Sequence, residues 1–241
     1  MSVRSFVRRI VHPAPLDATR SIASAVADAR TAHAGLPFCP THEGDLLFQL
    51  ASRPSVRRCL EIGFATGSTA LYMLEGIGSK ADGEVTSIDF KQSDFDYLGQ
   101  RIVTASRHAS RHRLIEGNTN TVLPDLYKGG FTCDLAFLDG WKVFDHLMLD
   151  VYFAARMLTE DGFIVFDDAR MRSTRKVISI LERYYRFVEI DYSQYETWKH
   201  RIWFGLSQGM RDWRRPYRAF SKPSGFESLP AITTFDYWRT F

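Results

Sequence analysis

The stretch RRCLEIGFATGSTALYMLEGI, residues 57–77, decides the fold. It opens with an apolar run of the length of a buried strand and closes with a helix-like segment. Gly63 and Gly67 lie in the loop between them, where glycine permits a tight turn and lets a ligand approach the backbone closely. A strand, a glycine loop and a helix in this order predict the first unit of an open α/β sheet, in which ligands bind outside the carboxyl ends of the strands.

The same alternation of strand and helix continues along the chain. After the strand at 57–64, further strands are predicted at 84–90, 113–118, 133–140, 162–168, 187–193 and 201–207. These runs are apolar throughout rather than alternating, which is typical of parallel strands covered on both faces. The last two runs are separated only by QYETWKH, a connection short enough for a hairpin. We therefore expect the final strand to be antiparallel.

The predicted architecture is an α/β fold with a Rossmann-like, seven-stranded, mostly parallel sheet and helices on both faces. Residues 1–40 contain several prolines around one helix-like segment, and we expect an N-terminal helical extension there. The sheet domain is expected at 41–208. A C-terminal arm rich in arginine and aromatic residues is expected at 209–241. We expect this extension to form a cap on the sheet domain.

The composition is that of a globular chain of 241 residues, with a formal net charge of +3 that does not by itself indicate nucleic-acid binding. Three cysteines cannot form a disulfide framework, and Cys59 and Cys133 lie in apolar runs, as small core residues do. No apolar run is long enough for a transmembrane helix, and the N-terminus lacks the apolar core of a secretory signal. We therefore expect a cytoplasmic protein.

Polar side chains follow the strands at the expected ligand-binding edge. The carboxylate of Asp89, after the second strand, could accept hydrogen bonds from two ribose hydroxyls. Asn118, after the third, could donate and accept hydrogen bonds to a ligand or could simply cap the next helix. The glycine loop lacks the G-x-G-x-x-G fingerprint of dinucleotide sites, and no G-K-[ST] of a P-loop follows it. A nicotinamide cofactor is therefore disfavoured.

An acidic residue, Glu61, stands ahead of the glycine loop, and the combination resembles the first motif of class I S-adenosylmethionine methyltransferases. In that family the loop lies against the methionyl part of the cofactor, and the region after the third strand borders the adenine. The resemblance implies that 41–208 is an S-adenosylmethionine-binding methyltransferase domain. The residues that we expect to bind the cofactor are Glu61, Gly63, Phe64, Gly67, Ser68, Asp89, Phe90, Gly117, Asn118 and Asp139.

Three aspartates end the fourth and fifth strands: Asp139, Asp167 and Asp168. If these strands are neighbours, the carboxylates crowd one edge of the sheet and repel one another. A hard divalent cation such as Mg²⁺ would remove that repulsion, since it prefers oxygen ligands. The alternative is that one aspartate caps a helix while another pairs with Arg170 or Arg172. The coincidence of strand ends favours the metal.

FLDGWK (137–142) followed by FIVFDD (163–168) resembles the cation-dependent O-methyltransferases of the catechol type. The resemblance implies that the three aspartates hold the cation and that Lys142 is the catalytic base. His146, one helical turn further on, is a second candidate base. Asp168 stands where that family has asparagine, and in this respect the chain is similar to macrolide and aminocoumarin sugar O-methyltransferases. Trp141 is expected to wall the acceptor pocket or to lie in the core.

The sequence therefore predicts an S-adenosylmethionine-dependent O-methyltransferase that uses a divalent cation and acts on a small-molecule hydroxyl, as in a catechol, vicinal diol or sugar. One alternative is a metal-independent N- or O-methyltransferase with structural aspartates. Another is an RNA methyltransferase or RNA-binding protein that uses the basic arm, although we favour an arm that packs on the domain or on a second copy in a homodimer. We expect no membrane partner.

Overall fold

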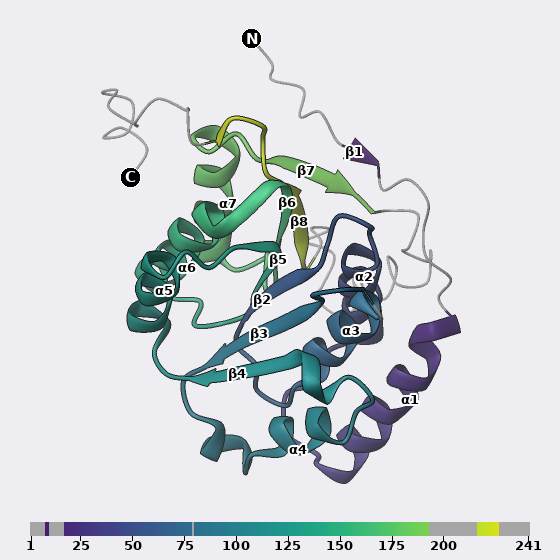
Figure 1. Ribbon diagram of the computed structural model, residues 1–241. Helices are drawn as coiled ribbons and strands as arrows, with labels where there is room; N and C mark the ends of the chain where they lie inside the picture. The colour runs from purple at the N-terminus through teal and green to yellow at the C-terminus, as the bar shows by residue number, and fades with distance from the viewer. Residues whose placement is uncertain (1–7, 10–16, 79, 193–215, 227–241) are drawn as a thin grey trace, which may run out of the picture.

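The computed structural model describes residues 8–9, 17–78, 80–192 and 216–226 (Figure 1). Within them, the strands form one eight-stranded sheet in the order β1-β7-β8-β6-β5-β2-β3-β4. The strands are β1 (Arg8–Arg9), β2 (Arg58–Ile62), β3 (Glu84–Asp89), β4 (His112–Glu116), β5 (Cys133–Leu138), β6 (Leu158–Phe166), β7 (Val188–Asp191) and β8 (Arg218–Ser221). The main helices are α1 (Asp17–Ala32), α2 (Thr41–Ala51), α3 (Ser68–Ile77), α4 (Leu98–Thr104), α5 (Thr119–Lys128), α6 (Phe144–Met157) and α7 (Arg172–Arg183).

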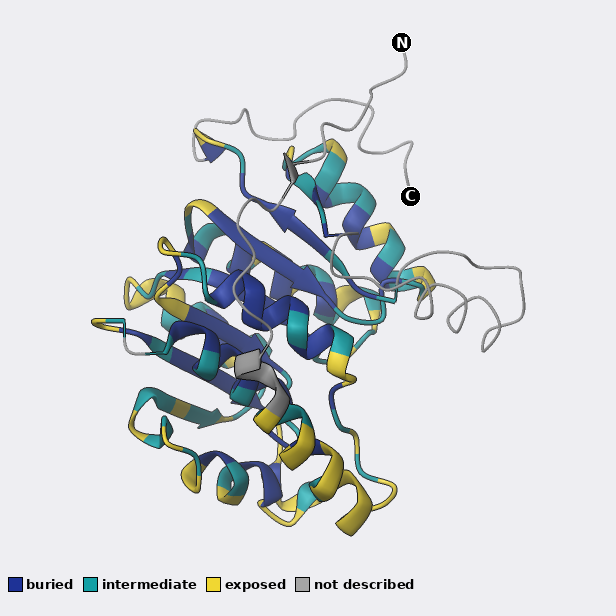
Figure 2. Ribbon diagram, turned by 90° about the vertical axis from the view of Figure 1, so that its right-hand side faces the viewer, coloured by how far each residue is buried: buried dark blue, intermediate teal, exposed yellow. Residues whose placement is uncertain are grey.

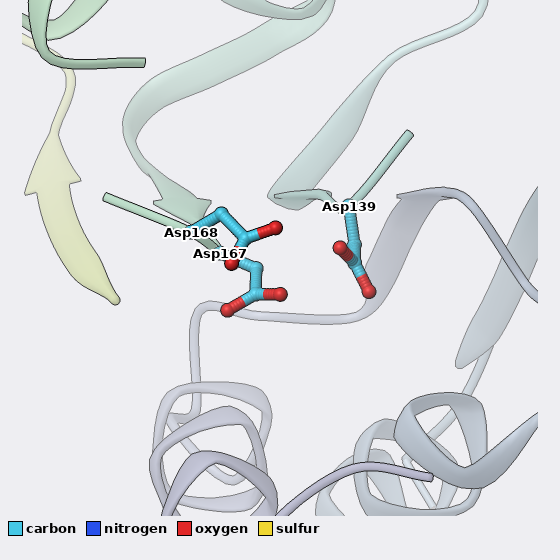
Figure 3. A group of neighbouring side chains, drawn as sticks. All are labelled: Asp139, Asp167 and Asp168. Carbon is cyan, nitrogen blue, oxygen red and sulfur yellow. The ribbon is translucent and has the colours of Figure 1, made fainter. Parts of the chain in front are cut away.

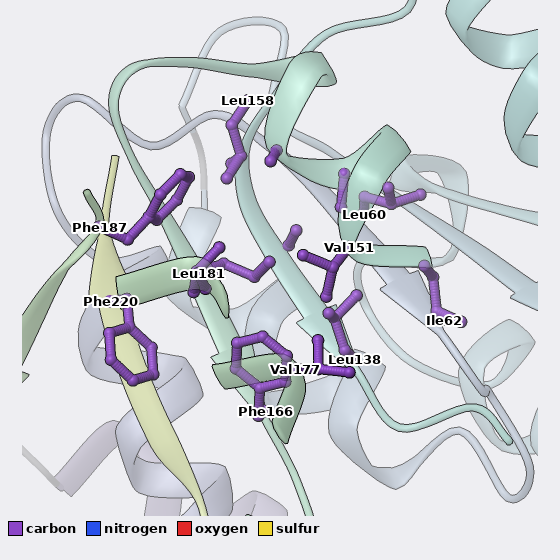
Figure 4. Packing of buried hydrophobic residues seen from close by; sticks show 14 of the residues in the cluster. Leu60, Ile62, Leu138, Val151, Leu158, Phe166, Val177, Leu181, Phe187 and Phe220 are labelled. Carbon is purple, nitrogen blue, oxygen red and sulfur yellow. The ribbon is translucent and has the colours of Figure 1, made fainter. Parts of the chain in front are cut away.

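The helices cover both faces of the sheet, as the sequence predicts (Figure 1). Successive side chains of each strand point to opposite faces. On β5, Leu135 and Phe137 join a core with α2 and α3, whereas Ala136 and Leu138 join a second core with α5, α6 and α7 (Figure 4). Buried residues occupy nearly the whole of the central strands (Figure 2). This double burial explains why the strands are apolar throughout.

All strand pairs are parallel except those made by β8, which lies antiparallel between β6 and β7. The expected mostly parallel sheet with an antiparallel strand is thus confirmed. The position of that strand differs from the expectation, because β8 lies at 218–221, within the segment that we expected to form the arm. It is only four residues long, too short for a recognisable pattern, and Phe220 holds it by packing edge-on against Phe166. The strand expected at 201–207 lies outside the described residues.

The N-terminal extension contributes α1, which packs against α3 and α2. Among the described helices, none has both the length and the apolar character needed to cross a membrane. The segment that joins α1 to α2 is fixed to the sheet domain by two hydrogen bonds. Thr66 Oγ1 donates to the carbonyl of Pro37 at 2.6 Å, and the Cys39 amide donates to Ser68 Oγ at 2.9 Å. We call this pair of contacts the seam.

Backbone hydrogen bonds between neighbouring strands continue one residue past the carboxyl ends of β2, β5 and β6. The amide of Gly63 donates to Ile88, that of Asp139 to Ile62, and that of Asp167 to Leu138. Because the ladders stay in register, Gly63, Asp139 and Asp167 come level at one edge of the sheet. The loops that follow β2, β5 and β6 therefore meet there.

Replacing Arg218 tests how far β8 depends on its ion pairs. The Arg218 guanidinium donates to Glu189 at 2.7 Å and to Glu182 at 2.9 Å, and its side chain is only 24% exposed. Arg218→Met leaves both carboxylates without this partner, so we expect the free energy of unfolding to fall by about 1–3 kcal/mol. Denaturant unfolding measures the loss. The control is Arg113→Met, which changes an exposed side chain on β4; equal stability of the two variants would contradict the prediction.

Candidate active site

Two adjoining cavities open at the carboxyl edge of the sheet. The first, of about 340 Å³, lies beyond β2, β3, β4 and β5 and is lined by Asp89, Phe90, Asn118 and Trp141 among others; we call it the aromatic cavity. The second, of about 160 Å³, lies between the start of α2 and the glycine loop; its lining includes Glu43, Ser68, Asp139 and Asp167, and we call it the acidic cavity. Gly63, Ala65 and Asp139 line both, so one elongated ligand could occupy the two.

Asp89 borders the aromatic cavity and also shapes the glycine loop. Its Oδ2 accepts from the amides of Phe64 at 3.0 Å and Ala65 at 2.7 Å, and its Oδ1 accepts from the amide of Lys91 at 3.0 Å. A carboxylate offers about four acceptor positions, so roughly one remains for a ligand. Asp89 can therefore accept one ligand hydroxyl without releasing the loop, fewer than the two that the sequence suggested.

Asn118 has the capping role that the sequence offered as an alternative, and it also borders the aromatic cavity. Its Oδ1 accepts from the Asn120 amide at 2.9 Å and caps α5, and the residue lines the aromatic cavity beside Gly117. Since the cap uses the oxygen, the amide nitrogen is the group left to donate to a ligand.

Two large aromatic side chains flank the aromatic cavity. Phe90 and Trp141 are 66% and 67% exposed, and their ring centroids lie 6.4 Å apart at an interplanar angle of 27°. His146 meets Trp141 edge-on at 5.1 Å. Trp141 and His146 thus line this cavity and not the acidic one. Of the two alternatives for Trp141, a place in the core is wrong, because the side chain is exposed.

The acid cluster, Asp139, Asp167 and Asp168, gathers at the ends of β5 and β6 (Figure 3). One carboxylate oxygen of each lies within 4.8 Å of the others. Burial raises the pKa of Asp139 to about 8, with Asp167 adding to the shift and Lys142 opposing it. Burial and the neighbouring Asp167 also raise the pKa of Asp168. Close oxygens from three carboxylates form a donor set that suits a hard divalent cation.

Lys142 lies beside the acid cluster. Its ammonium donates to Asp139 Oδ1 at 2.7 Å and to the carbonyl of Gly140 at 3.3 Å, and only 11% of the side chain is exposed. The same position is within reach of a hydroxyl bound at the cluster.

Glu61 does not reach either cavity. It is fully buried under the glycine loop, where Thr69 Oγ1 donates to one oxygen and Ser87 Oγ donates to the other at 2.5 Å. Ser87 also contacts His112 Nε2 at 2.9 Å. Glu61 is thus an internal support for the start of α3 rather than a ligand contact. The register could have indicated this, because Glu61 lies directly opposite Ser87 on the neighbouring strand.

A pH series on Glu61→Gln tests this support. Burial raises the pKa of Glu61 from 4.5 to about 7, against the opposing hydroxyls of Ser87 and Thr69. The folded state therefore holds a proton that the unfolded state releases, and the stability from this group is lost as pH rises from 4.5 to 7. We expect the difference in unfolding free energy, wild type minus variant, to fall by about 3 kcal/mol between pH 4.5 and 8.

The pKa of His112 is shifted in the opposite direction from that of Glu61, so His112 makes stability depend on pH in the opposite way. Its contribution serves as an internal control for the pH series. Burial lowers its pKa from 6.5 to about 4, so its contribution to stability is present above the unfolded pKa and is lost as pH falls toward 4. The contribution of His112 should persist in Glu61→Gln. The unfolding free energy of that variant should therefore rise as pH increases from about 4 to 6.5. A pH-independent difference between wild type and variant would contradict the assignment.

The structure places the remaining candidates as follows. Phe64 and Ser68 line the acidic cavity, whereas Gly67 begins α3 with a left-handed backbone (φ +71°) and lines neither cavity. Sequence reasoning missed Glu43 and Cys39, which come from the segment before the glycine loop. The sequence did not indicate a role for these two side chains, because they reach the site only when α2 packs against α3.

A larger apolar cavity of about 550 Å³ lies between α1, α3 and α4. It shares Phe38, Thr66 and Ser68 with the acidic cavity, and these residues form the wall between the two. The seam runs along this wall. The larger cavity is therefore adjacent to the acidic one but separated from it by hydrogen-bonded backbone.

Comparison with known proteins shows what this chain is similar to. Residues 60–169 match a family model described as a methyltransferase domain. An O-methyltransferase of Aspergillus thermomutatus is 30% identical over 54% of this chain and 52% of its own length. A probable O-methyltransferase of Mycobacterium tuberculosis H37Rv is 31% identical over 53% of this chain and 54% of its own. The chain spans about half the length of the curated relatives it matches.

Among solved structures, the S-adenosylmethionine complex of the O-methyltransferase TomG of Streptomyces achromogenes, involved in tomaymycin synthesis, superposes with a TM-score of 0.56. The match covers 71% of this chain and 80% of TomG at 19% identity, and therefore shows a shared fold.

The family model thus places a methyltransferase domain at residues 60–169, in the part of the sheet whose carboxyl edge carries the two cavities. The curated relatives that match this chain are described as O-methyltransferases, so the chain is similar to proteins of that kind. The resemblance noted in the sequence is thus confirmed.

Proposed function

We propose that this protein transfers a methyl group from S-adenosylmethionine to a hydroxyl of a small molecule and that a divalent cation assists the reaction. The observation that carries the proposal is the junction of the two cavities at Gly63 and Asp139, with the acid cluster at that junction. A cofactor bound along both cavities would bring its sulfonium close to the acid cluster. There the methyl group could meet an acceptor oxygen in line.

The aromatic cavity suits the adenosine part of the cofactor. Phe90 and Trp141 offer apolar faces for a flat base, Asn118 offers a donor, and Asp89 keeps about one acceptor position for a ribose hydroxyl. The acidic cavity then receives the methionyl part against the loop from Gly63 to Ser68.

The acid cluster suits Mg²⁺ or another hard divalent cation. Asp139, Asp167 and Asp168 would hold it through carboxylate oxygens that already lie within 4.8 Å of one another. Bound there, such an ion would supply an orienting contact for the acceptor oxygen and would lower the pKa of its hydroxyl. In a catechol, diol or sugar, a second oxygen would strengthen that orientation.

Transfer forms the new oxygen–carbon bond as the sulfur–carbon bond breaks, and the hydroxyl proton must leave. Lys142 is the proposed acceptor of that proton, since its nitrogen lies 2.7 Å from Asp139 at the cluster. It can act in this way only as the neutral amine. His146 is the weaker candidate, because it lines the aromatic cavity instead.

The test is methyl transfer from labelled S-adenosylmethionine to a panel of catechols, vicinal diols and sugars, with and without EDTA. We expect turnover with at least one acceptor, loss of turnover in EDTA and recovery with Mg²⁺ or Mn²⁺. Failure to bind S-adenosylhomocysteine would overturn the cofactor assignment.

One observation favours a second candidate, a metal-independent methyltransferase. The Lys142 ammonium already neutralises part of the cluster through Asp139. Turnover that survives EDTA would support this candidate and would leave the aspartates with a structural role.

A further inference from the structure

The apolar cavity of about 550 Å³ between α1, α3 and α4 takes no part in the proposed reaction; we call it the helix cavity. Its three helices lie beside one another (Figure 1). Proteins commonly bind small molecules in cavities of about 300–1,000 Å³. A wall that includes Phe38, Thr66 and Ser68 separates the helix cavity from the acidic one. A ligand bound here would therefore be distinct from the cofactor and from the methyl acceptor.

Small side chains on α1 create this space. Ser21, Ala25 and Ala29 are each about one helical turn apart, and all three line the helix cavity. Residues at that spacing share one face of a helix. Protein interiors are normally packed as closely as organic crystals, and atoms that line a void lose dispersion contacts. A bound molecule would restore those contacts, so the missing volume favours an occupant.

The body of that occupant should be hydrocarbon. Most of the cavity surface is apolar, and its apolar side chains come from all three helices: Ile22 and Val26 from α1, Leu71 and Leu74 from α3, and Ile102 from α4. Hydrocarbon gains free energy when it leaves water for such a surface, whereas a polar group would find no partner there. The polar end of a ligand therefore needs a different part of the cavity.

A cluster of polar side chains borders the helix cavity just beyond the end of α4. Ser106, Arg107 and His108 belong to it, and Glu75 on α3 contacts the last two. Both oxygens of Glu75 accept hydrogen bonds from Arg107, and His108 Nε2 lies 3.2 Å from one of them. The Arg107 side chain is 73% exposed. The cluster therefore marks the mouth of the cavity, where a charged ligand group stays in contact with water.

This polar cluster has hydrogen-bond donors to spare. The hydrogen bonds of Arg107 use its Nε and Nη2, which leaves Nη1 to donate to a ligand. Ser106 Oγ accepts from the His108 amide at 3.3 Å, so its hydroxyl proton can also be donated. The carboxylate of Glu75, in contrast, already accepts from its neighbours. Spare donors on a guanidinium suit a ligand carboxylate, which guanidinium groups bind through short, charge-assisted hydrogen bonds.

We propose that the helix cavity binds a small hydrophobic carboxylate, such as a medium-chain fatty acid. The hydrocarbon chain lies between α1, α3 and α4, and the carboxylate accepts from Arg107 and Ser106 at the mouth. This site requires neither S-adenosylmethionine nor the acid cluster, so it stands or fails independently of the proposed function. Because the ligand binds only the folded protein, it should also raise the melting temperature.

Calorimetry with decanoate and decan-1-ol tests the role of the carboxylate. Wild type should bind one decanoate per chain and should bind decan-1-ol about 10-fold more weakly, because the alcohol offers Arg107 no charge. In Arg107→Met, the affinity for decanoate should fall about 10-fold, to that for the alcohol. Arg101→Met is the matched control, since Arg101 is an exposed arginine of α4 that pairs with Asp96 and does not line the cavity. This variant should bind both ligands as wild type does.

Ala29→Phe tests where the ligand binds. The added ring occupies part of the helix cavity, so decanoate and decan-1-ol should both bind at least about 5-fold more weakly. Ala27→Phe is the matched control, because Ala27 is an exposed residue of α1 that does not line the cavity. Its affinities should equal those of wild type.

Equal decanoate affinity in wild type and Arg107→Met would overturn the proposal, and this result does not depend on whether Ala29→Phe folds. Unchanged affinity in a folded Ala29→Phe would also overturn it, because the acid would then bind elsewhere on the protein. So would a wild type that binds no decanoate. If sedimentation in that case shows a dimer that Ala29→Phe dissociates, a second copy of the chain covers the cavity instead.

Discussion

Asp139→Asn should lower methyl transfer by at least about 100-fold while binding of S-adenosylhomocysteine persists. Asp139 supplies one of the three clustered oxygens and also receives the Lys142 ammonium at 2.7 Å. The amide keeps the size of the side chain but removes its charge, so it weakens both the cation site and the placement of Lys142. Initial rates at saturating cofactor measure the loss of methyl transfer. Calorimetry measures the binding of S-adenosylhomocysteine and of Mn²⁺ separately.

Asp145→Asn is the control for this prediction, because Asp145 is an exposed carboxylate on the neighbouring α6. Its rate and its Mn²⁺ affinity should match wild type. Normal turnover in Asp139→Asn would show that the ligand assignment is wrong. Lost turnover with unchanged Mn²⁺ affinity would instead assign the effect to Lys142 alone.

Gly63→Ala should lower the free energy of unfolding by about 2–5 kcal/mol, from backbone strain and overpacking together. Gly63 has φ +92°, a conformation that side chains disfavour, and a Cβ there would overlap the carbonyl of Asp139. Since Gly63 lines both cavities, the same change should weaken S-adenosylhomocysteine binding by more than about 10-fold, the equivalent of 1.4 kcal/mol. Urea unfolding and calorimetry check the two parts.

Gly130→Ala is the control that separates the cost of backbone strain at a positive φ from the cost of steric overlap of the new Cβ. Gly130 also has a positive φ, +74°, but a Cβ there would meet no atom within 4 Å. This variant should lose only the strain term of about 1–3 kcal/mol, with ligand binding unchanged. If both variants lose equal stability and both keep ligand affinity, the close approach of Gly63 to Asp139 has no role in the site.

The fold was predictable because each central strand is buried on both faces, which leaves a continuous apolar run in the sequence. The strand ends were predictable for the same reason, and with them the meeting of Asp139 and Asp167. β8 was not, because its four residues are specified by contacts such as that between Phe220 and Phe166, which exist only after folding.

The sequence predicted the position of a site residue correctly only where that residue directly follows the end of a strand. Glu61 lies within β2, so the pleat of the strand directs its side chain toward Thr69 and Ser87 rather than toward a ligand. Glu43 was missed because it belongs to a helix before the glycine loop, and only the packing of α2 against α3 brings it to the acidic cavity.

Asp89 has a further consequence for the kinetics of ligand capture. Its Oδ2 accepts from the amides of Phe64 and Ala65, and these hydrogen bonds within the protein fix the shape of the glycine loop without needing a cofactor to form. The ordering entropy of the loop is then met during folding, and encounter need not wait for a slow rearrangement. Hydrogen exchange at these two amides should accordingly be slow without ligand and should change little when S-adenosylhomocysteine is added.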